Sequence, residues 1–167
     1  MIKISTALAV FLGLIFSVSV SADDDDSTDG RPLVRFDGGI GSQPLRSGPA
    51  PNAVNGVNAG GVPWEIEDLR AEVKTDGRIS VDGRGLLLGG GSRIGTPGTP
   101  RNVSATLFCG GVGHDTNPVP VDDEGDFRIN GQLYPAPPTP CAGPVLLIRS
   151  NNGGVPGSWF AAGILKP

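Results

Sequence analysis

The stretch RNVSATLFC at residues 101–109 gives the clearest indication of the fold. Apolar residues from Val103 to Cys109 recur at every second position, and the polar Ser104 and Thr106 lie between them. Successive side chains of an extended chain point to opposite faces, so this alternation places the apolar residues on one face. The stretch therefore predicts a β-strand with one face in the core.

Similar short runs, separated by turn residues, recur on both sides of this strand. Asp82-Gly83 and the acidic stretch 122–126 are predicted turns. Pro120 predicts that the strand around it lies at a sheet edge, because proline cannot donate to a ladder. The apolar run 145–149 suits a central strand. The further predicted strands cover 78–81, 86–88, 119–121, 127–129, 145–149 and 159–164.

Residues 64–74 fit two structures. Pro63 could occupy the first position of a helix that begins with acidic residues and ends on a basic one. Alternating apolar residues also fit a strand, provided that a single bulge near Asp68 brings both halves onto one face. We favour the strand because the turn dipeptide Asp76-Gly77 and strand-rich sequence follow.

About seven short strands at a spacing of roughly 8–15 residues predict an all-β fold, a single small β-sandwich over residues 62–167. It is immunoglobulin-like only in a loose sense, because no tryptophan lies between the two cysteines. We expect Cys109 and Cys141 to form a disulfide that staples this domain. Their spacing is not that of a metal-binding or redox pair.

The N-terminus predicts export. Lys3, an apolar run and small residues up to Ala22 are typical of a secretory signal peptide over residues 1–22, followed abruptly by Asp23–Asp26. The apolar run is shorter than the ~20 residues that cross a bilayer. We interpret residues 23–61 as a flexible Gly/Pro/Asn-rich leader in which Leu33–Phe36 could form a short strand. The expected location is secreted, periplasmic or extracellular.

Charge excludes some partners. Removal of residues 1–22 takes away Lys3 and leaves 12 basic against 17 acidic residues, a formal charge of −5. Nucleic acids and anionic membrane surfaces need clustered basic residues, so we expect neither as a partner. No later stretch is long and apolar enough to span a membrane.

The sequence contains no convincing catalytic or metal-binding set. Gly89–Gly95 is followed by two prolines instead of a helix, so it predicts a loop and not a phosphate site. His114, the single histidine, is expected in an exposed loop, without the partners of a catalytic triad or a zinc site. The acidic stretch 122–126 lacks the spacing of an EF-hand and predicts a solvated hairpin tip. We expect no cofactor and no enzyme activity.

Tyr134, in an exposed-looking proline-rich loop, is the single candidate binding residue. Trp64 and Trp159 have apolar strand neighbours and are expected in the core. Asn102 begins an N-glycosylation pattern at the start of the predicted core strand 101–109.

These observations favour a secreted, non-enzymatic binding or surface-interaction module for an extracellular or envelope ligand. Two alternatives stay open. One is a small secreted hydrolase or a protease inhibitor that presents a loop such as Gly110–Pro118 or Pro135–Pro140. The other is an envelope structural protein that self-associates through strand edges.

Overall fold

The computed structural model describes residues 30–45, 52–99 and 101–167. All regular secondary structure in these residues is β-strand, and they contain no helix that could span a membrane. The predicted signal peptide, residues 1–22, lies outside them. The strands are β1 (Pro32–Gly41), β2 (Trp64–Glu65), β3 (Asp68–Lys74), β4 (Arg78–Arg84), β5 (Leu87–Leu88), β6 (Asn102–Cys109), β7 (Val112–Asp115), β8 (Val119–Pro120), β9 (Phe127–Gln132), β10 (Val145–Asn152) and β11 (Val155–Leu165).

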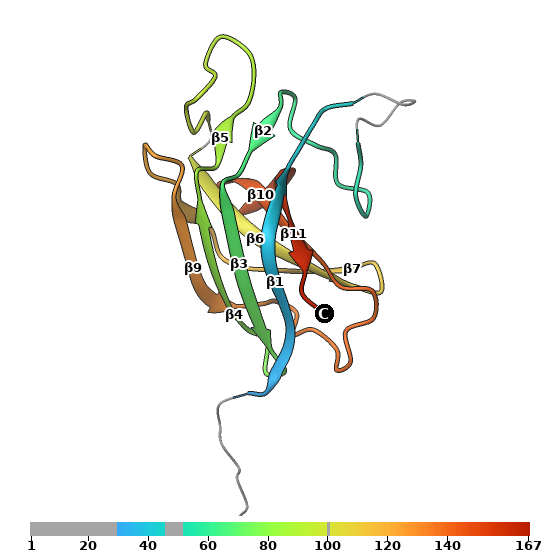
Figure 1. The fold of residues 1–167 in the computed structure, drawn as a ribbon. Coiled ribbons are helices and arrows are strands. Elements are labelled where there is room, and N and C mark those ends of the chain that lie inside the picture. Colours follow the sequence, from blue (N-terminus) through green and yellow to red (C-terminus); the bar gives the residue numbers. More distant parts are fainter. Residues whose placement is uncertain (1–29, 46–51, 100) are drawn as a thin grey trace, which may run out of the picture.

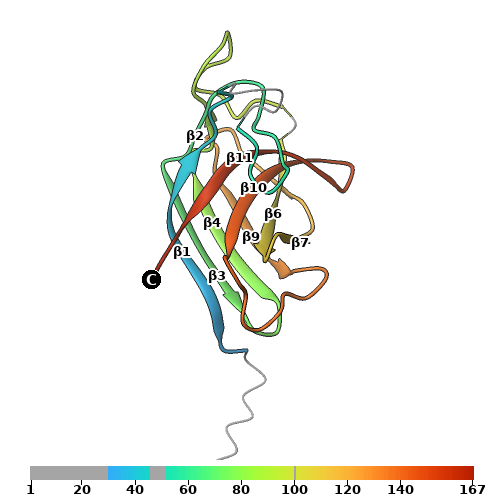
Figure 2. The same ribbon diagram turned by 90° about the vertical axis from the view of Figure 1, so that its right-hand side faces the viewer.

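Nine strands form one curled antiparallel sheet. Its order is β7-β6-β10-β11-β1-β3-β4-β9, and β8 pairs with β6, as β7 does. The curl makes the half formed by β1, β3, β4 and β9 face the half formed by β6, β7 and β10, as in a sandwich (Figures 1 and 2). A separate two-stranded ladder joins β2 to β5. The predicted all-β, sandwich-like fold is confirmed.

The main core lies between the two halves. Alternate residues of a strand point to opposite faces, and the inward-facing apolar side chains of the longer strands, such as β3, β4, β6 and β10, form this core. Trp64 stacks on Phe160 at one end of this core, with ring centroids 3.9 Å apart. The fully buried aliphatic residues include Leu69, Val73, Val81, Leu107, Ile129, Leu133, Leu146 and Ile148.

The bend of the sheet lies at β1 and β11. The pairing of these strands shifts register between Phe36 and Gly39, and Gly38 there has a φ of +91°, which glycine adopts without a steric penalty. The Phe36 ring lies against Gly163, where a Cβ would stand 3.1 Å from ring atoms. At Gly41 a Cβ would stand 2.0 Å from the carbonyl oxygen of Trp64. Glycine therefore permits the backbone approaches that bend the sheet.

Within residues 23–61, predicted to be a flexible leader, the structure contains a strand of the main sheet. Residues 32–41 of that range are β1, which pairs with β11 on one side and β3 on the other. The short strand predicted at Leu33–Phe36 is confirmed and extends to Gly41. Composition misled the prediction because the glycines of β1 serve close packing instead of flexibility.

Residues 52–61, also part of the predicted leader, cover the outer face of the sheet. The backbone N–H of Trp159 donates to the Asn58 carbonyl (3.0 Å), and its indole N–H donates to the Asn52 carbonyl (3.0 Å). Asn55 and Gly56, both with positive φ, form a tight turn in this segment. Below it, Ala59, Phe108, Leu147 and Trp159 form a second apolar cluster.

Most strand predictions are confirmed, and the ambiguous range 64–74 is strand. It is interrupted after Glu65 and resumes at Asp68, the position where a bulge was expected. The turn predicted at Asp82-Gly83 is wrong, because both residues lie within β4. The Phe127 ring lies over Gly83 across the β4–β9 pair, so this glycine makes room for an aromatic ring.

The disulfide prediction is confirmed. Cys109 at the end of β6 bonds to Cys141 before β10, with the two Cα atoms 4.9 Å apart and a sequence separation of 32. The buried positions predicted for Trp64 and Trp159 are confirmed as well.

Reduction of the disulfide should lower the free energy of unfolding by about 3.7 kcal/mol, the chain-entropy value for a loop of this length. Chemical denaturation of the protein with and without a reductant measures this difference. A Cys109→Ala/Cys141→Ala variant should match the reduced protein. Equal unfolding midpoints for the oxidised and reduced protein would contradict the expectation.

The variant Gly41→Ala should lower the free energy of unfolding by about 2–3 kcal/mol, because its Cβ would overlap the Trp64 carbonyl oxygen. The matched control is Gly131→Ala in β9, where no atom lies within 4 Å of the Cβ position. The control should equal the wild type or exceed it slightly. Urea titration followed by tryptophan fluorescence compares the three proteins.

Candidate functional site

A groove of about 650 Å³ lies where the two ends of the curled sheet approach each other. One wall comes from β4 and β9, and the other comes from β8 and the turn after it. We call this region the seam, meaning the gap between residues 115–122 and residues 126–134. The groove is lined by Asp82, Gly83, Arg84, Val119, Pro120, Val121, Asp122, Asp126, Phe127 and Arg128.

The seam is joined at both ends and has no ladder between them. At one end, Asp115 and Tyr134 exchange two backbone hydrogen bonds of 2.9 Å. At the other end, the N–H of Asp122 donates to the carbonyl of Asp126 (3.1 Å). Between these contacts β8 pairs with β6, and β9 pairs with no strand of the described residues except β4.

The groove floor is apolar. Val121 and Phe127 are buried, and Val119 is half-buried against the main core. The Phe127 ring packs directly on the backbone of Gly83 in β4 and forms part of the groove floor. A ligand in this groove would therefore meet an ordered apolar base.

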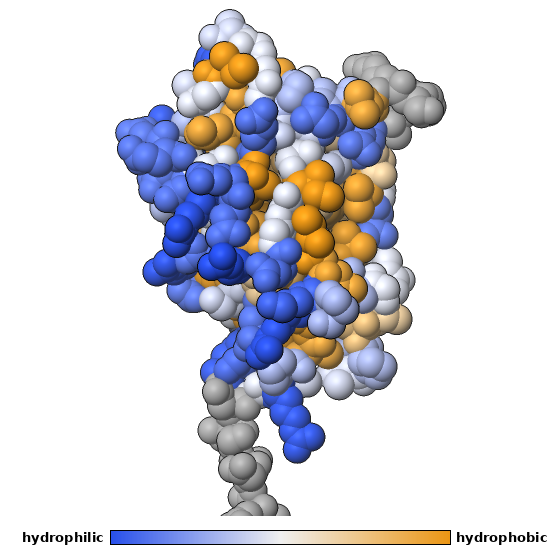
Figure 3. Space-filling view, viewed as in Figure 1, coloured by the Kyte–Doolittle hydropathy of each residue, from blue (hydrophilic) through white to orange (hydrophobic). Residues whose placement is uncertain are grey.

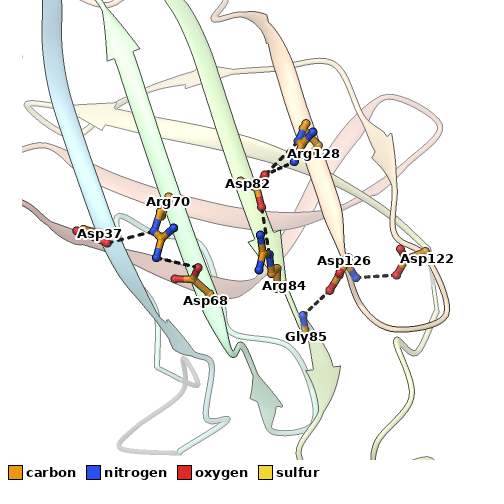
Figure 4. A network of polar contacts seen from close by, with 9 residues as sticks. All are labelled: Asp37, Asp68, Arg70, Asp82, Arg84, Gly85, Asp122, Asp126 and Arg128. Atoms are coloured by element: carbon orange, nitrogen blue, oxygen red, sulfur yellow. Dashed lines mark hydrogen bonds and ion pairs between the residues drawn. The ribbon is translucent and has the colours of Figure 1, made fainter.

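Charged side chains of both signs form the rim on the β4–β9 side (Figure 4). The guanidinium of Arg128 donates to Asp82 through Nε (3.0 Å) and a terminal nitrogen, and Arg84 lies 3.6 Å from the same carboxylate. The hydrogen bond from Arg128 is the largest cause that lowers the pKa of Asp82, and partial burial opposes it. The carboxylate therefore stays ionised at neutral pH.

The rim belongs to a wider charged face. Figure 3 shows hydrophilic residues gathered over β3, β4 and β9, beside an apolar region over β1 and β11. On this face, Arg70 of β3 lies 3.6 Å from Asp37 and 3.5 Å from Asp68, while Arg35 pairs with Glu72 at 2.7 Å. These pairs are partly exposed, so each contributes little to stability.

The acidic stretch 122–126 is a turn between β8 and β9, as predicted. Asp122 organises it, because its Oδ1 accepts the N–H groups of Glu124 (3.1 Å) and Asp126 (2.7 Å). Oδ1 of Asp126 accepts the N–H of Gly85 (3.0 Å), which ties the turn to the end of β4. Among the described residues there is no group of three side chains that could hold a metal ion.

Tyr134, the predicted binding residue, lies at the opposite end of the seam. Its side chain is 64% exposed, while its backbone pairs with Asp115. Asp115 is itself held by Thr106, which donates to its carboxylate, and lies 3.9 Å from Arg149. The structure thus places Tyr134 and the acidic turn at the two ends of the seam, with the groove beside the acidic turn, which sequence spacing alone did not reveal.

His114 is not in an exposed loop, and that prediction was wrong. It lies in β7 opposite Leu107 and is 3% exposed. Its Nδ1 is 2.7 Å from the carbonyl oxygen of Pro135, and its Nε2 has no hydrogen-bond partner among the described residues. The glycines around His114 suggested a loop. In the structure Gly113 lies within β7, where the absence of a side chain leaves room for the Phe108 ring.

The other predicted positions do not line the groove. Gly89–Gly95 is a loop, as expected, closed by a hydrogen bond from the N–H of Gly95 to the Leu88 carbonyl (2.8 Å). Asn102 is exposed at the start of β6. Of the loops considered for an inhibitor, Gly110–Pro118 contains strand β7, whereas Pro135–Pro140 is largely exposed.

The Asp82–Arg128 pair predicts a pH dependence. Because the pKa of Asp82 is lowered in the folded protein, its contribution to stability is complete above the unfolded value of about 3.9. That contribution is lost as the pH falls through the folded pKa. Wild type should therefore exceed Asp82→Asn in thermal midpoint at neutral pH, and the difference should vanish in strong acid. A difference that stays constant from neutral to acidic pH would show that the ion pair is not its cause.

Comparison with known proteins found no matching family model, no matching curated protein and no matching solved structure. The function is therefore inferred from the residues of the seam, their charges and their backbone groups.

Proposed function

We propose that this protein is an exported, non-enzymatic binding module whose ligand lies in the seam. The observation that carries the proposal is the groove of about 650 Å³ between β8 and the end strand β9. Ligand sites are concave, with an apolar base and a few placed polar groups. The seam combines an apolar floor with a rim of Asp82, Arg84 and Arg128.

The rigidity of the seam supports this role. Its walls are strands, and its ends are fixed by the Asp115–Tyr134 bridge and by the Asp122 turn. A site held by ordered strands loses little conformational entropy when a ligand binds. Binding at such a site needs no catalytic group.

The disulfide supports the expected location outside the reducing cytosol. Cys109 and Cys141 are bonded, and such bonds persist in oxidising compartments. The acidic net charge favours a ligand other than nucleic acid. The expected ligand is therefore extracellular or part of a cell envelope.

Binding of the purified exported protein to insoluble polysaccharides and cell-envelope fractions tests the proposal. We expect saturable binding that Arg128→Ala weakens at least tenfold, because this side chain lines the groove. Arg35→Ala is the matched control, since Arg35 also forms an ion pair on the charged face but does not line the groove. Tyr134→Ala and the reduced wild-type protein are measured in the same assay.

The possible results distinguish an error in the proposed site from an error in the proposed function. Saturable binding that Arg128→Ala leaves unchanged would place the ligand elsewhere on the protein. Loss of binding in Tyr134→Ala alone would move the site to the loop after β9. No saturable binding to any fraction would overturn the binding-module proposal and favour the inhibitor or self-association alternatives.

A further inference from the structure

The loop between β5 and β6 stands clear of the rest of the molecule. Its residues 89–99 rise beyond the end of the sandwich in both ribbon views (Figures 1 and 2). Residues 91–96 are all exposed, and Ile94 is 65% exposed. Apart from its chain neighbours, no atom lies within 4 Å of the position that a Cβ on Gly95 would occupy. The tip of the loop, Arg93-Ile94, is therefore open to a partner.

The hydrogen bonds of the tip are local. The N–H and the hydroxyl of Thr96 both donate to the Arg93 carbonyl (3.2 and 2.8 Å), and Gly95 between them has a φ of +78°, as in a type II turn. Two backbone hydrogen bonds of 2.8 Å between Leu88 and residues 95–96 close the base of the loop. Opening of the tip therefore breaks no strand pairing of the main sheet.

Arg93 also differs in charge environment from the arginines of the charged face. Arg70, Arg84 and Arg128 each lie within 3.6 Å of a carboxylate. The guanidinium of Arg93 lies 3.4 Å from the hydroxyl of Thr99 and forms no ion pair among the described residues. An acidic pocket on a partner could therefore receive this guanidinium without breaking an existing ion pair.

The other basic residues that the structure describes lie in or next to strands. At the strand ends, the carbonyl of Arg84 accepts an N–H from the segment before β3 (3.0 Å), and the carbonyl of Arg101 accepts one from the residue after β8 (2.7 Å). Proline follows both Arg31 and Lys166. A peptide bond inside a strand pair is reached only after the sheet opens, which costs more than the opening of a surface loop. Arg93-Ile94 is thus the most accessible bond after a basic residue in the described part of the chain.

A cut in this loop leaves the sandwich joined. It separates β1–β5 from β6–β11, yet β1 of the first group pairs with β11, and β9 of the second group pairs with β4. Trp64 of the first group stacks on Phe160 of the second, with ring centroids 3.9 Å apart. Two ladders and the shared main core therefore hold the two pieces together.

We propose that the Arg93–Ile94 bond is a processing site for a trypsin-like serine protease, and that the two pieces stay folded as one molecule. Such a protease carries an acidic group in the pocket that receives the residue before the cut bond. Exposed loop tips with small residues are the preferred sites of such cuts. Water is the second reactant: its oxygen becomes part of the new Arg93 carboxylate, and the Ile94 nitrogen leaves as a protonated amine. The inference does not involve the seam and stands apart from the proposed binding function.

Limited digestion of the exported protein, residues 23–167, with trypsin at neutral pH tests this inference. The cut after Arg93 should be roughly a hundredfold faster than cuts after the other described basic residues, because local opening precedes global unfolding. Intact mass and N-terminal sequencing identify each cut, including one after Arg46, which lies outside the described residues. Arg93→Gln should remove the product, and Arg93→Lys should restore it. Arg84→Gln, at the end of β4, is the matched control and should be cut like the wild type.

The nicked protein should elute from a sizing column with the intact protein and separate into two pieces only in denaturant. Separation in native buffer would contradict the two-piece molecule. A bond after Arg93 that survives as long as the bonds within strands would overturn the processing site. Cleavage after Ile94 by chymotrypsin, with the Arg93 bond resistant to trypsin, would replace the protease class. A stable complex that inhibits trypsin with the chain uncut would overturn hydrolysis and favour the inhibitor alternative.

Discussion

The whole architecture depends on the close backbone approaches at the glycines of β1 and β11. The nine-stranded sheet has an extensive apolar inner face, and it can bury that face against itself only by bending sharply. The bend falls where Gly38 adopts a positive φ and where Gly163 lies under the Phe36 ring. A side chain at Gly41 would collide with the backbone of Trp64. Without these contacts the two halves of the core could not meet.

The same bend produces the seam. Curling brings β9, the last strand of the sheet order, close to the β7–β8 side of β6, and closure would be complete if a ladder formed there. Pro120 stands where β8 would have donated to β9. The groove is thus the place where closure of the sheet stops, and its polar backbone edge is a consequence of the fold and not of any special loop.

Local patterns in the sequence predicted the strands, the disulfide and the buried tryptophans, because each depends on residues close in the chain or on compartment chemistry. The alternation at 101–109 is one example, since its period directly reports a strand. The same reasoning fails at β1, where glycine-rich composition predicts flexibility although the close packing of β1 against the distant strand β11 requires glycine. The Asn55-Gly56 turn was a recognisable hairpin signal that the prediction did not use.

The site itself was beyond local patterns. Asp82 and Arg128 are 46 residues apart and meet only because β4 pairs with β9. His114 was misplaced for a related reason: its burial comes from Leu107 and from the carbonyl of Pro135, both supplied by other strands and loops. The sequence identifies Tyr134 and the acidic turn separately, but only the strand order shows that they lie at the two ends of the seam.

The two ends of the seam are held by independent interactions, and this decides how it can respond to a ligand. Beyond Tyr134 the chain is held by the Pro135–His114 contact and by the disulfide at Cys141, while the acidic end is held by Asp126 through Gly85. The ends therefore resist separation, and the hollow between them lies beside residues 119–122 and 126–128. A groove that is held at both ends loses little conformational entropy when a ligand binds. Selectivity then falls on the groups that line the groove, which are its apolar floor of Val121 and Phe127 and its charged rim of Asp82, Arg84 and Arg128.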